Sequence, residues 1–205
     1  MISLNKTNFY TEFSNNLKLD NGDIVYLVSD LTNLFVKFKK MNLKFDINKL
    51  IDSILNKIDS NGTLLIPTFN WDYCKGIDFH YLHTKSMTGV LGKTALLRKD
   101  FDRTNNPIYS FAVTGKYKNY LLKFKNEDCF GNKSPFDFLY KKNAKYVSID
   151  INFRDYGFTP IHYAEQKANA SYRFIKTFEG YWTFKNKKKV KKKYQFFVRY
   201  LDQST

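Results

Sequence analysis

Residues 46–67 read DINKLIDSILNKIDSNGTLLIP, and this segment carries the clearest folding signal in the chain. Asp46 begins an amphipathic helix, and the Asn-Gly pair at 61–62 ends it. Residues 63–67 then form a short apolar strand. The apolar side chains of the helix recur on one stripe, at Ile47, Leu50, Ile51, Ile54, Leu55 and Ile58.

The same alternation of strand and helix patterns extends in both directions. A buried strand is expected at 23–28, after an Asn-Gly turn at 21–22, and Ser29 or Asp30 can cap the helix that follows. Further helices are predicted at 6–17, 89–99, from Ser134-Pro135 and at 160–170, with strands near 111–113 and 146–149 and a hairpin at 181–201. This order predicts an α/β fold: a single layered domain over residues 1–205, with a central mixed sheet flanked by helices and a β-rich C-terminal hairpin.

Composition favours a globular protein of the cytoplasm. The chain has 205 residues, of which 43% are apolar, enough for one domain with a sizeable core. Cys74 and Cys129 stand far apart without a CxxC partner, which suits a reducing compartment and predicts no acyl-enzyme nucleophile. No apolar run approaches the roughly 20 residues that span a bilayer, and the N-terminus lacks the apolar core of a signal peptide.

The net charge of +15 has two explanations. Abundant lysine and asparagine are typical of an AT-rich genome, whereas a positive field also attracts phosphate-bearing ligands such as coenzyme A or nucleotide-linked sugars. The sharpest cluster, at 185–193, is typical of a nucleic-acid, localisation or membrane-surface patch. Because strand patterns flank it, we favour a lysine-rich hairpin turn that also protects a sheet edge.

Residues 159–165 read Thr-Pro-Ile-His-Tyr-Ala-Glu and predict a helix start that carries chemistry. Thr159 can cap this helix, Pro160 suits its first turn, and His162 and Glu165 lie three apart on one face. The carboxylate can then orient the imidazole, as a general base requires, and the helix dipole favours the neutral ring. The local pattern alone equally fits an ordinary helix with one partly exposed histidine.

Several phrases occur in a fixed order along the chain, at 22–31, 62–71, 84–91, 106–115, 134–136 and 162–165. Together they resemble the aminoglycoside N-acetyltransferase family of the non-GNAT, antibiotic-acetyltransferase type, over residues 17–199. Residues 172–180 look more like the members that accompany surface-polysaccharide synthesis. The resemblance implies an N-acyltransferase that uses acetyl-CoA or another acyl-CoA, with His162 and Glu165 activating the acceptor amine.

The resemblance also implies which residues bind the coenzyme. Ser29, Asp30 and Leu31 occupy a strand-to-helix junction that contacts it in the family, although Val28 replaces the family's histidine and Asp30 its second serine. An aspartate is unfavourable beside phosphates, so Ser29 is the better candidate of the two.

A second junction contains Ser86, Gly89, Val90 and Leu91, where backbone N–H groups at a helix start can receive phosphate. Ordinary helix capping is the alternative at both junctions. Ser110 matches the family pattern and can offer its hydroxyl to the thioester or the pantetheine.

Candidate acceptor contacts follow a strand end and the His-Glu segment. Thr68, Asn70 and Trp71 come directly after the strand at 63–67, where α/β proteins commonly place ligands, although Trp71 also suits a core. Tyr172 and Arg173 can meet an anionic acceptor, or Arg173 can pair with a carboxylate of the protein.

Metal binding is not predicted. His80 and His83 have no third ligand in the same loop.

The leading hypothesis is therefore direct acyl transfer to the amine of a small-molecule amino sugar destined for a surface glycan, with no nucleic acid as partner. Three alternatives remain: aminoglycoside resistance on the same scaffold, a nucleic-acid-binding module built on residues 185–193, and a non-catalytic subunit of a split acyltransferase. The last follows from the resemblance, because relatives usually continue past Leu201 through further helices; a homo-oligomer or a complementary chain would then complete the site.

Overall fold

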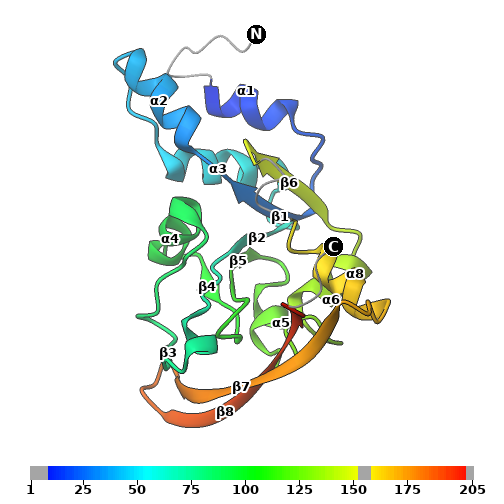
Figure 1. The fold of residues 1–205 in the computed structure, drawn as a ribbon. Helices are drawn as coiled ribbons and strands as arrows, with labels where there is room; N and C mark the ends of the chain where they lie inside the picture. The colour runs from blue at the N-terminus through cyan, green and yellow to red at the C-terminus, as the bar shows by residue number, and fades with distance from the viewer. Residues whose placement is uncertain (1–8, 152–157, 202–205) are drawn as a thin grey trace.

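The computed structural model describes residues 9–151 and 158–201 and contains two sheets with helices around them (Figure 1). The central sheet has the strand order β4-β5-β2-β1-β6. Its strands are β1 (Ile24–Ser29), β2 (Thr63–Pro67), β4 (Asp102–Arg103), β5 (Phe111–Gly115) and β6 (Lys145–Ile149). Strand β1 is parallel to β2 and β6, whereas β5 is antiparallel to β2 and β4. The predicted mixed α/β fold is confirmed.

The central sheet separates two hydrophobic clusters, because successive side chains of a strand point to opposite faces. In β1, Val25 and Leu27 belong to the cluster on the side of α1 (Phe9–Asn16) and α3 (Ile47–Ile58). Ile24 and Tyr26 belong to the other cluster, which is rich in aromatic rings. The helices α2 (Thr32–Lys40), α4 (Gly89–Leu97), α5 (Lys118–Leu122), α6 (Pro135–Lys141) and α8 (Ile161–Lys167) complete the two sides.

Helix α3 has the start that its sequence predicts. The side chain of Asp46 accepts hydrogen bonds from the backbone N–H groups of Asn48 and Lys49. The helix ends earlier than predicted, because Asp59 already has a positive φ of 56°, two residues before the Asn-Gly pair. The apolar stripe is fully buried at Leu50, Ile51, Ile54 and Ile58.

Helices α6 and α8 are joined by a buried hydrogen bond. Ser134 caps α6 by accepting from the N–H of Asp137 at 3.1 Å. The Asp137 carboxylate in turn accepts from the hydroxyl of Tyr163 in α8 at 3.0 Å. The predicted cap of α8 is wrong: Pro160 precedes its first residue, already in a helical conformation, and no side-chain cap bond forms, so Thr159 does not cap it.

A second sheet has the order β3-β7-β8, with β3 (Phe79–His80), β7 (Arg173–Thr183) and β8 (Lys189–Arg199). It curves beneath the central sheet, as the orange and red arrows of Figure 1 show. The predicted hairpin at 181–201 is present, but its first strand begins at Arg173 and its turn is confined to 184–188. Residues 189–193 are therefore part of a strand rather than of a lysine-rich turn, as the sequence had suggested.

Carboxylates balance much of the charge along this hairpin. Lys185 pairs with Asp102 at 2.9 Å and Lys189 with Asp78 at 2.9 Å, while Lys191 and Lys193 both pair with Glu179. The lysine cluster is thus largely an ion-paired strand surface.

Four short elements were not expected from the sequence: β3, β4, α5 and the 3₁₀ helix at Asp72–Lys75. Within the described residues, no helix has the length and apolar character needed to cross a bilayer.

We expect Asp46→Ala to lower the free energy of unfolding by about 1 kcal/mol, because two N–H groups of α3 lose their acceptor. Asp46→Asn is the matched control, since its amide oxygen can still accept. Urea denaturation of the three proteins measures the effect. Equal stabilities for the Ala and Asn variants would show that this cap does not stabilise α3.

Candidate functional site

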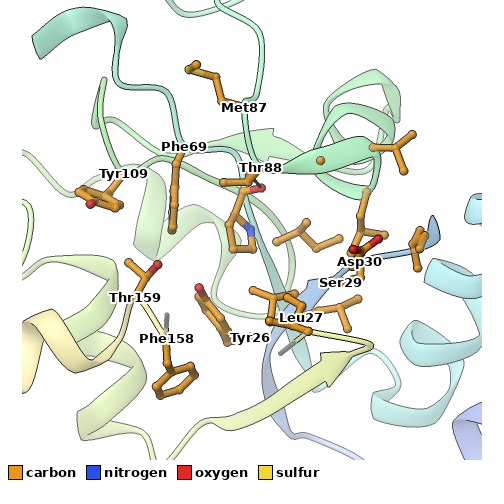
Figure 2. Close-up of a pocket in the computed structure, with 18 of the residues that line it drawn as sticks. Tyr26, Leu27, Ser29, Asp30, Phe69, Met87, Thr88, Tyr109, Phe158 and Thr159 are labelled. Atoms are coloured by element: carbon orange, nitrogen blue, oxygen red, sulfur yellow. Dashed lines mark hydrogen bonds between the residues drawn. The ribbon is translucent and has the colours of Figure 1, made fainter. Parts of the chain in front are cut away.

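A cavity of about 720 Å³ lies where β1 and β2 end and α2 and α4 begin. Ser29 and Asp30 lie at one end of it and Tyr109, Thr159 and Phe158 at the other (Figure 2). Ligands commonly bind beyond the carboxyl ends of parallel strands, because loops and helix starts converge there. The side chains predicted from sequence that line this cavity are Ser29, Asp30, Leu31, Trp71, Gly89, Val90, Leu91 and His162.

His162 forms the wall of this cavity and bonds to Glu165 behind it. Nδ1 of the imidazole lies 2.6 Å from Oε2 of the carboxylate, one helical turn further along α8. The histidine side chain is a quarter exposed, and its ring meets the edge of Phe130 at a centroid distance of 5.7 Å. The predicted orientation of an imidazole by a carboxylate is therefore present in the geometry.

Burial and nearby charge favour a neutral imidazole. Burial lowers the pKa of His162 most strongly, and the positive charge of Arg173 lowers it further, against the opposing effect of Glu165. Burial alone would raise the pKa of Glu165, but hydrogen bonds from His162 and Tyr172 and the charge of Arg173 together lower it. The pair is thus an ionised carboxylate beside a neutral ring, and burial is the largest cause of the lowered pKa of His162.

Tyr172 and Arg173 lie around Glu165 rather than in the cavity lining. The Tyr172 hydroxyl donates to Oε1 of Glu165 at 2.8 Å, and Nε of Arg173 lies 2.9 Å from Oε2. Of the two alternatives that the sequence left open for Arg173, the structure has the pairing with a carboxylate. Neither side chain lines this cavity.

The end of the cavity at Ser29 and Asp30 has unused polar groups. The hydroxyl of Ser29 is buried and has no hydrogen-bond partner within the described part of the chain. Thr88 precedes α4 but donates its hydroxyl to the carbonyl of Pro67 at 2.7 Å, so it caps none of the first N–H groups of that helix. Asp30 accepts from the N–H of Thr32 at 2.9 Å, but the cap position of α2 is Leu31 and no side chain caps the helix, so the predicted cap at Ser29 or Asp30 is wrong.

Four predicted contacts are turned away from the cavity. Ser86 is buried and bonds to Thr88 at 3.0 Å. Thr68 and Ser110 are fully buried and bond to each other at 2.9 Å. The Asn70 side chain donates to the carbonyl of Lys85 through Nδ2 and accepts from the N–H of Asp72 through Oδ1.

A buried arginine holds Ser110 and the backbone around it in place. Arg103 is 2% exposed and donates to the carbonyl oxygens of Thr68 and Thr84 and to the hydroxyl of Ser110. Its guanidinium carbon also lies 4.8 Å from the centre of the Phe79 ring. Because bonds to a charged donor are strong, Arg103 fixes the end of β2 to the loop that leads to α4. Arg103 was not among the residues predicted from the sequence, because no local motif indicates that an arginine at this position is buried.

Sequence reasoning also missed Tyr26, Phe69, Met87, Thr88 and Thr159 as lining residues. Figure 2 shows Tyr26 and Thr159 close together beside Phe158. Most of them lie in or beside the phrases that carry the family resemblance, which is the signal that could have identified them.

In the described ranges, no three His, Cys, Asp or Glu side chains gather in a way that could hold a metal ion. The rings of His80 and His83 are exposed, with centroids 6.4 Å apart.

Comparison with known proteins gives one family and one fold. The family described as aminoglycoside 3-N-acetyltransferase matches residues 37–203. No curated protein sequence matches the chain. Among solved structures, AAC-IIIb in a binary complex with CoASH is similar with a TM-score of 0.75 at 16% identity, over 92% of this chain and 74% of that one.

Two further structures have the same fold. The YokD protein from Bacillus subtilis is similar with a TM-score of 0.73 at 21% identity, over 92% of this chain and 80% of that one. Sisomicin-bound AAC-VIa is similar with a TM-score of 0.75 at 17% identity, over 92% of this chain and 74% of that one.

We expect the imidazole of His162 to become protonated only below its ordinary pKa of 6.5. In Glu165→Gln the midpoint should fall further, because the variant loses the negative charge that favours the imidazolium. NMR titration of the ring, assigned with His162→Ala, measures both midpoints. A midpoint above 6.5 in the unmodified protein would mean that the carboxylate outweighs burial.

The same shift links to stability. Below about pH 6.5 the unfolded chain binds a proton that the folded ring resists, so stability falls as pH drops through this range. The lowered pKa of Glu165 adds a second loss at lower pH, as that carboxylate is protonated in the folded state.

Proposed function

The chain belongs to the aminoglycoside 3-N-acetyltransferase family, and from this premise we propose that it acylates the amine of an amino sugar used in surface glycan synthesis, with His162 as general base. As a member of this family it is an N-acetyltransferase that takes its acyl group from an acyl-CoA. The observation that carries the proposed mechanism is the neutral imidazole in the cavity wall, bonded through Nδ1 to an ionised Glu165.

The residues at one end of the cavity fit an acyl-CoA. The unpartnered hydroxyl of Ser29 and the uncapped N–H groups at the start of α4 can bond to its phosphates or its pantetheine. Leu31, Phe35 and Val90 offer apolar contacts beside them. Asp30 is the one unfavourable group, because its carboxylate faces the same region.

The chain's own residues then act on the acceptor. An acyl-CoA supplies an activated thioester carbonyl. Glu165 accepts a hydrogen bond from the N–H at Nδ1 of His162. Nε2 is then free to take a proton from the acceptor's ammonium group. The freed amine forms the new C–N bond and the C–S bond breaks. The imidazolium returns its proton to the departing thiolate, and the neutral ring then takes the second proton from the new amide nitrogen and passes it to solvent. Neither Cys74 nor Cys129 lines the cavity, so direct transfer without an acyl-enzyme is the simpler route.

Aminoglycoside acetylation is the second candidate, favoured by the family description and by the likeness to sisomicin-bound AAC-VIa. Electrostatics oppose it. An antibiotic with several positive charges would meet a chain of net charge +15 and a cavity in which Asp30 is the single carboxylate among the described lining residues. An acceptor with one amine, or one that carries phosphate, meets no such barrier.

The hairpin gives little support to a nucleic-acid-binding module. Lys185, Lys189, Lys191 and Lys193 are ion-paired with carboxylates, and the ammonium group of Lys192 lies over the rings of Trp182, Phe184 and Tyr194. Four of the seven lysines at 185–193 thus already have carboxylate partners, which leaves fewer of them for phosphates.

A thiol-release assay with acetyl-CoA tests the acceptor. We expect release with nucleotide-linked amino sugars and little with aminoglycosides. Turnover of aminoglycosides alone would replace the glycan role by the second candidate. Running the assay with and without candidate partner chains tests the predicted need for a complementary subunit.

His162→Ala should reduce turnover by roughly 10²- to 10⁴-fold, the usual range for a general base. His83→Ala is the matched control, because His83 is an exposed histidine outside the cavity lining. Steady-state kinetics with acetyl-CoA and the best acceptor measure both. A loss below threefold in His162→Ala would remove this residue from the role.

Asp30→Asn should bind acetyl-CoA about two- to fivefold more tightly, because one negative charge beside the phosphates is removed. The asparagine oxygen can still accept from Thr32. Asp52→Asn, at the ion pair with Arg98, is the control for a change in net charge. Calorimetric titration at low and high salt measures the difference, and equal affinities for the two variants would place the phosphates away from α2.

A further inference from the structure

The carboxylate of Glu165 is held by two side chains besides His162. Its Oε1 accepts from the Tyr172 hydroxyl at 2.8 Å, and its Oε2 lies 2.9 Å from Nε of Arg173 as well as 2.6 Å from the imidazole. The side chains of Glu165 and Arg173 are only 14% and 13% exposed. Both oxygens therefore have partners in a setting where water competes weakly, although Nε of Arg173 acts through its charge and is not aligned for a hydrogen bond.

The arginine is fixed independently of the carboxylate that it pairs with. Arg173 is the first residue of β7, and Nη1 of its guanidinium donates to the carbonyl of Phe197 in β8 at 3.1 Å. Its guanidinium carbon also lies 6.0 Å from the centre of the Tyr172 ring. The hairpin thus places a positive charge against Glu165, and α8 carries Glu165 and His162 together.

A carboxylate held in this way limits the states of the imidazole. An ionised Glu165 accepts a hydrogen bond from the N–H at Nδ1. This bond selects the tautomer in which Nε2 carries no proton. The nearby positive charge opposes a second proton on the ring. Without Tyr172 and Arg173, the Glu165 carboxylate could rotate, and it would lose the positive charge that balances its own.

We propose that Arg173 and Tyr172 are positioning residues for N-acyl transfer, which hold the Glu165 carboxylate ionised and aligned and so keep His162 in the neutral tautomer that carries its proton on Nδ1. This inference rests on the proposed role of His162 as base. It gives both residues a task other than the acceptor contact that the sequence suggested.

The sign of the pH effect follows from the groups that face His162. Within residues 9–151 and 158–201, the charged groups that act on the ring are Glu165 from α8 and Arg173 from β7, with Tyr172 acting through Glu165. The Phe130 ring that packs against it is uncharged. Removing the charge of Arg173 leaves Glu165 unopposed, so the imidazolium becomes easier to form and the pKa of His162 rises.

The central experiment compares Arg173→Gln with Arg173→Lys. In Arg173→Gln, we expect kcat to fall roughly 10- to 100-fold, as for other supporting partners of a reactive group, with KM for acetyl-CoA within threefold. The acid limb of the pH profile should move up by about one unit. Arg173→Lys keeps the charge and should restore the limb. Lys189→Gln, which removes an equivalent charge and ion pair further along the hairpin, should change neither.

A second pair of variants tests the hydroxyl. Tyr172→Phe should lower kcat by about three- to tenfold, the cost of one hydrogen bond to a carboxylate, whereas Tyr181→Phe on the exposed side of the hairpin should not. The ¹⁵N shifts of His162 report the tautomer directly. They should show the proton on Nδ1 in the unmodified protein and a mixture of tautomers in Tyr172→Phe and Arg173→Gln.

The outcomes separate this inference from the proposed function. If His162→Ala is inactive but Arg173→Gln and Tyr172→Phe match their controls in kcat, acid limb and tautomer, the positioning role is wrong and the base remains. If His162→Ala is active, the proposed base is wrong, and the positioning role in acyl transfer that rests on it is wrong too. Should Arg173→Gln not fold, Tyr172→Phe decides: an unchanged tautomer, with a kcat equal to that of Tyr181→Phe, overturns the inference.

Discussion

The parallel pairing of β1 with both of its neighbours is the constraint from which the rest of the structure follows. Ile24 to Tyr26 align with β2, and Val25 to Ser29 align with β6, so β1 is enclosed at both edges as well as on both faces. Parallel strands end at the same edge of a sheet, and α2 and α4 begin there. The cavity exists because the backbone turns away from the sheet at these points and leaves helix N–H groups and loop side chains facing one another.

Signals that act within a few residues were enough to predict most of the fold. Asp46 and Ser134 cap the helices that their sequences predicted, because a short polar side chain satisfies N–H groups only two or three residues away. The spacing of His162 and Glu165 likewise predicted their contact, since three residues make less than one helical turn. Thr159 shows the limit even here: Pro160 already has helical φ and ψ, so the cap position moves past the threonine.

The fate of the other candidate side chains depended on partners far away in the chain. Thr68 and Ser110 have the residue types of a ligand site, but their hydroxyls bond to each other inside the protein, and Ser110 also accepts from the buried Arg103. Tyr172 and Arg173 suit an anionic ligand equally well, and the anion that they meet is a carboxylate of the protein itself. A sequence states which groups can form a hydrogen bond, whereas tertiary packing selects the partner.

The buried hydroxyl of Ser29 has a consequence for how the protein divides free energy between folding and binding. A polar atom without a partner makes the empty fold less stable by about 1–3 kcal/mol than a fully satisfied one would be. Any guest that bonds to this oxygen returns that deficit as affinity. Part of the binding free energy is therefore matched by a lower free energy of unfolding in the ligand-free protein. Ser29→Ala would remove both the loss of stability and the gain in affinity.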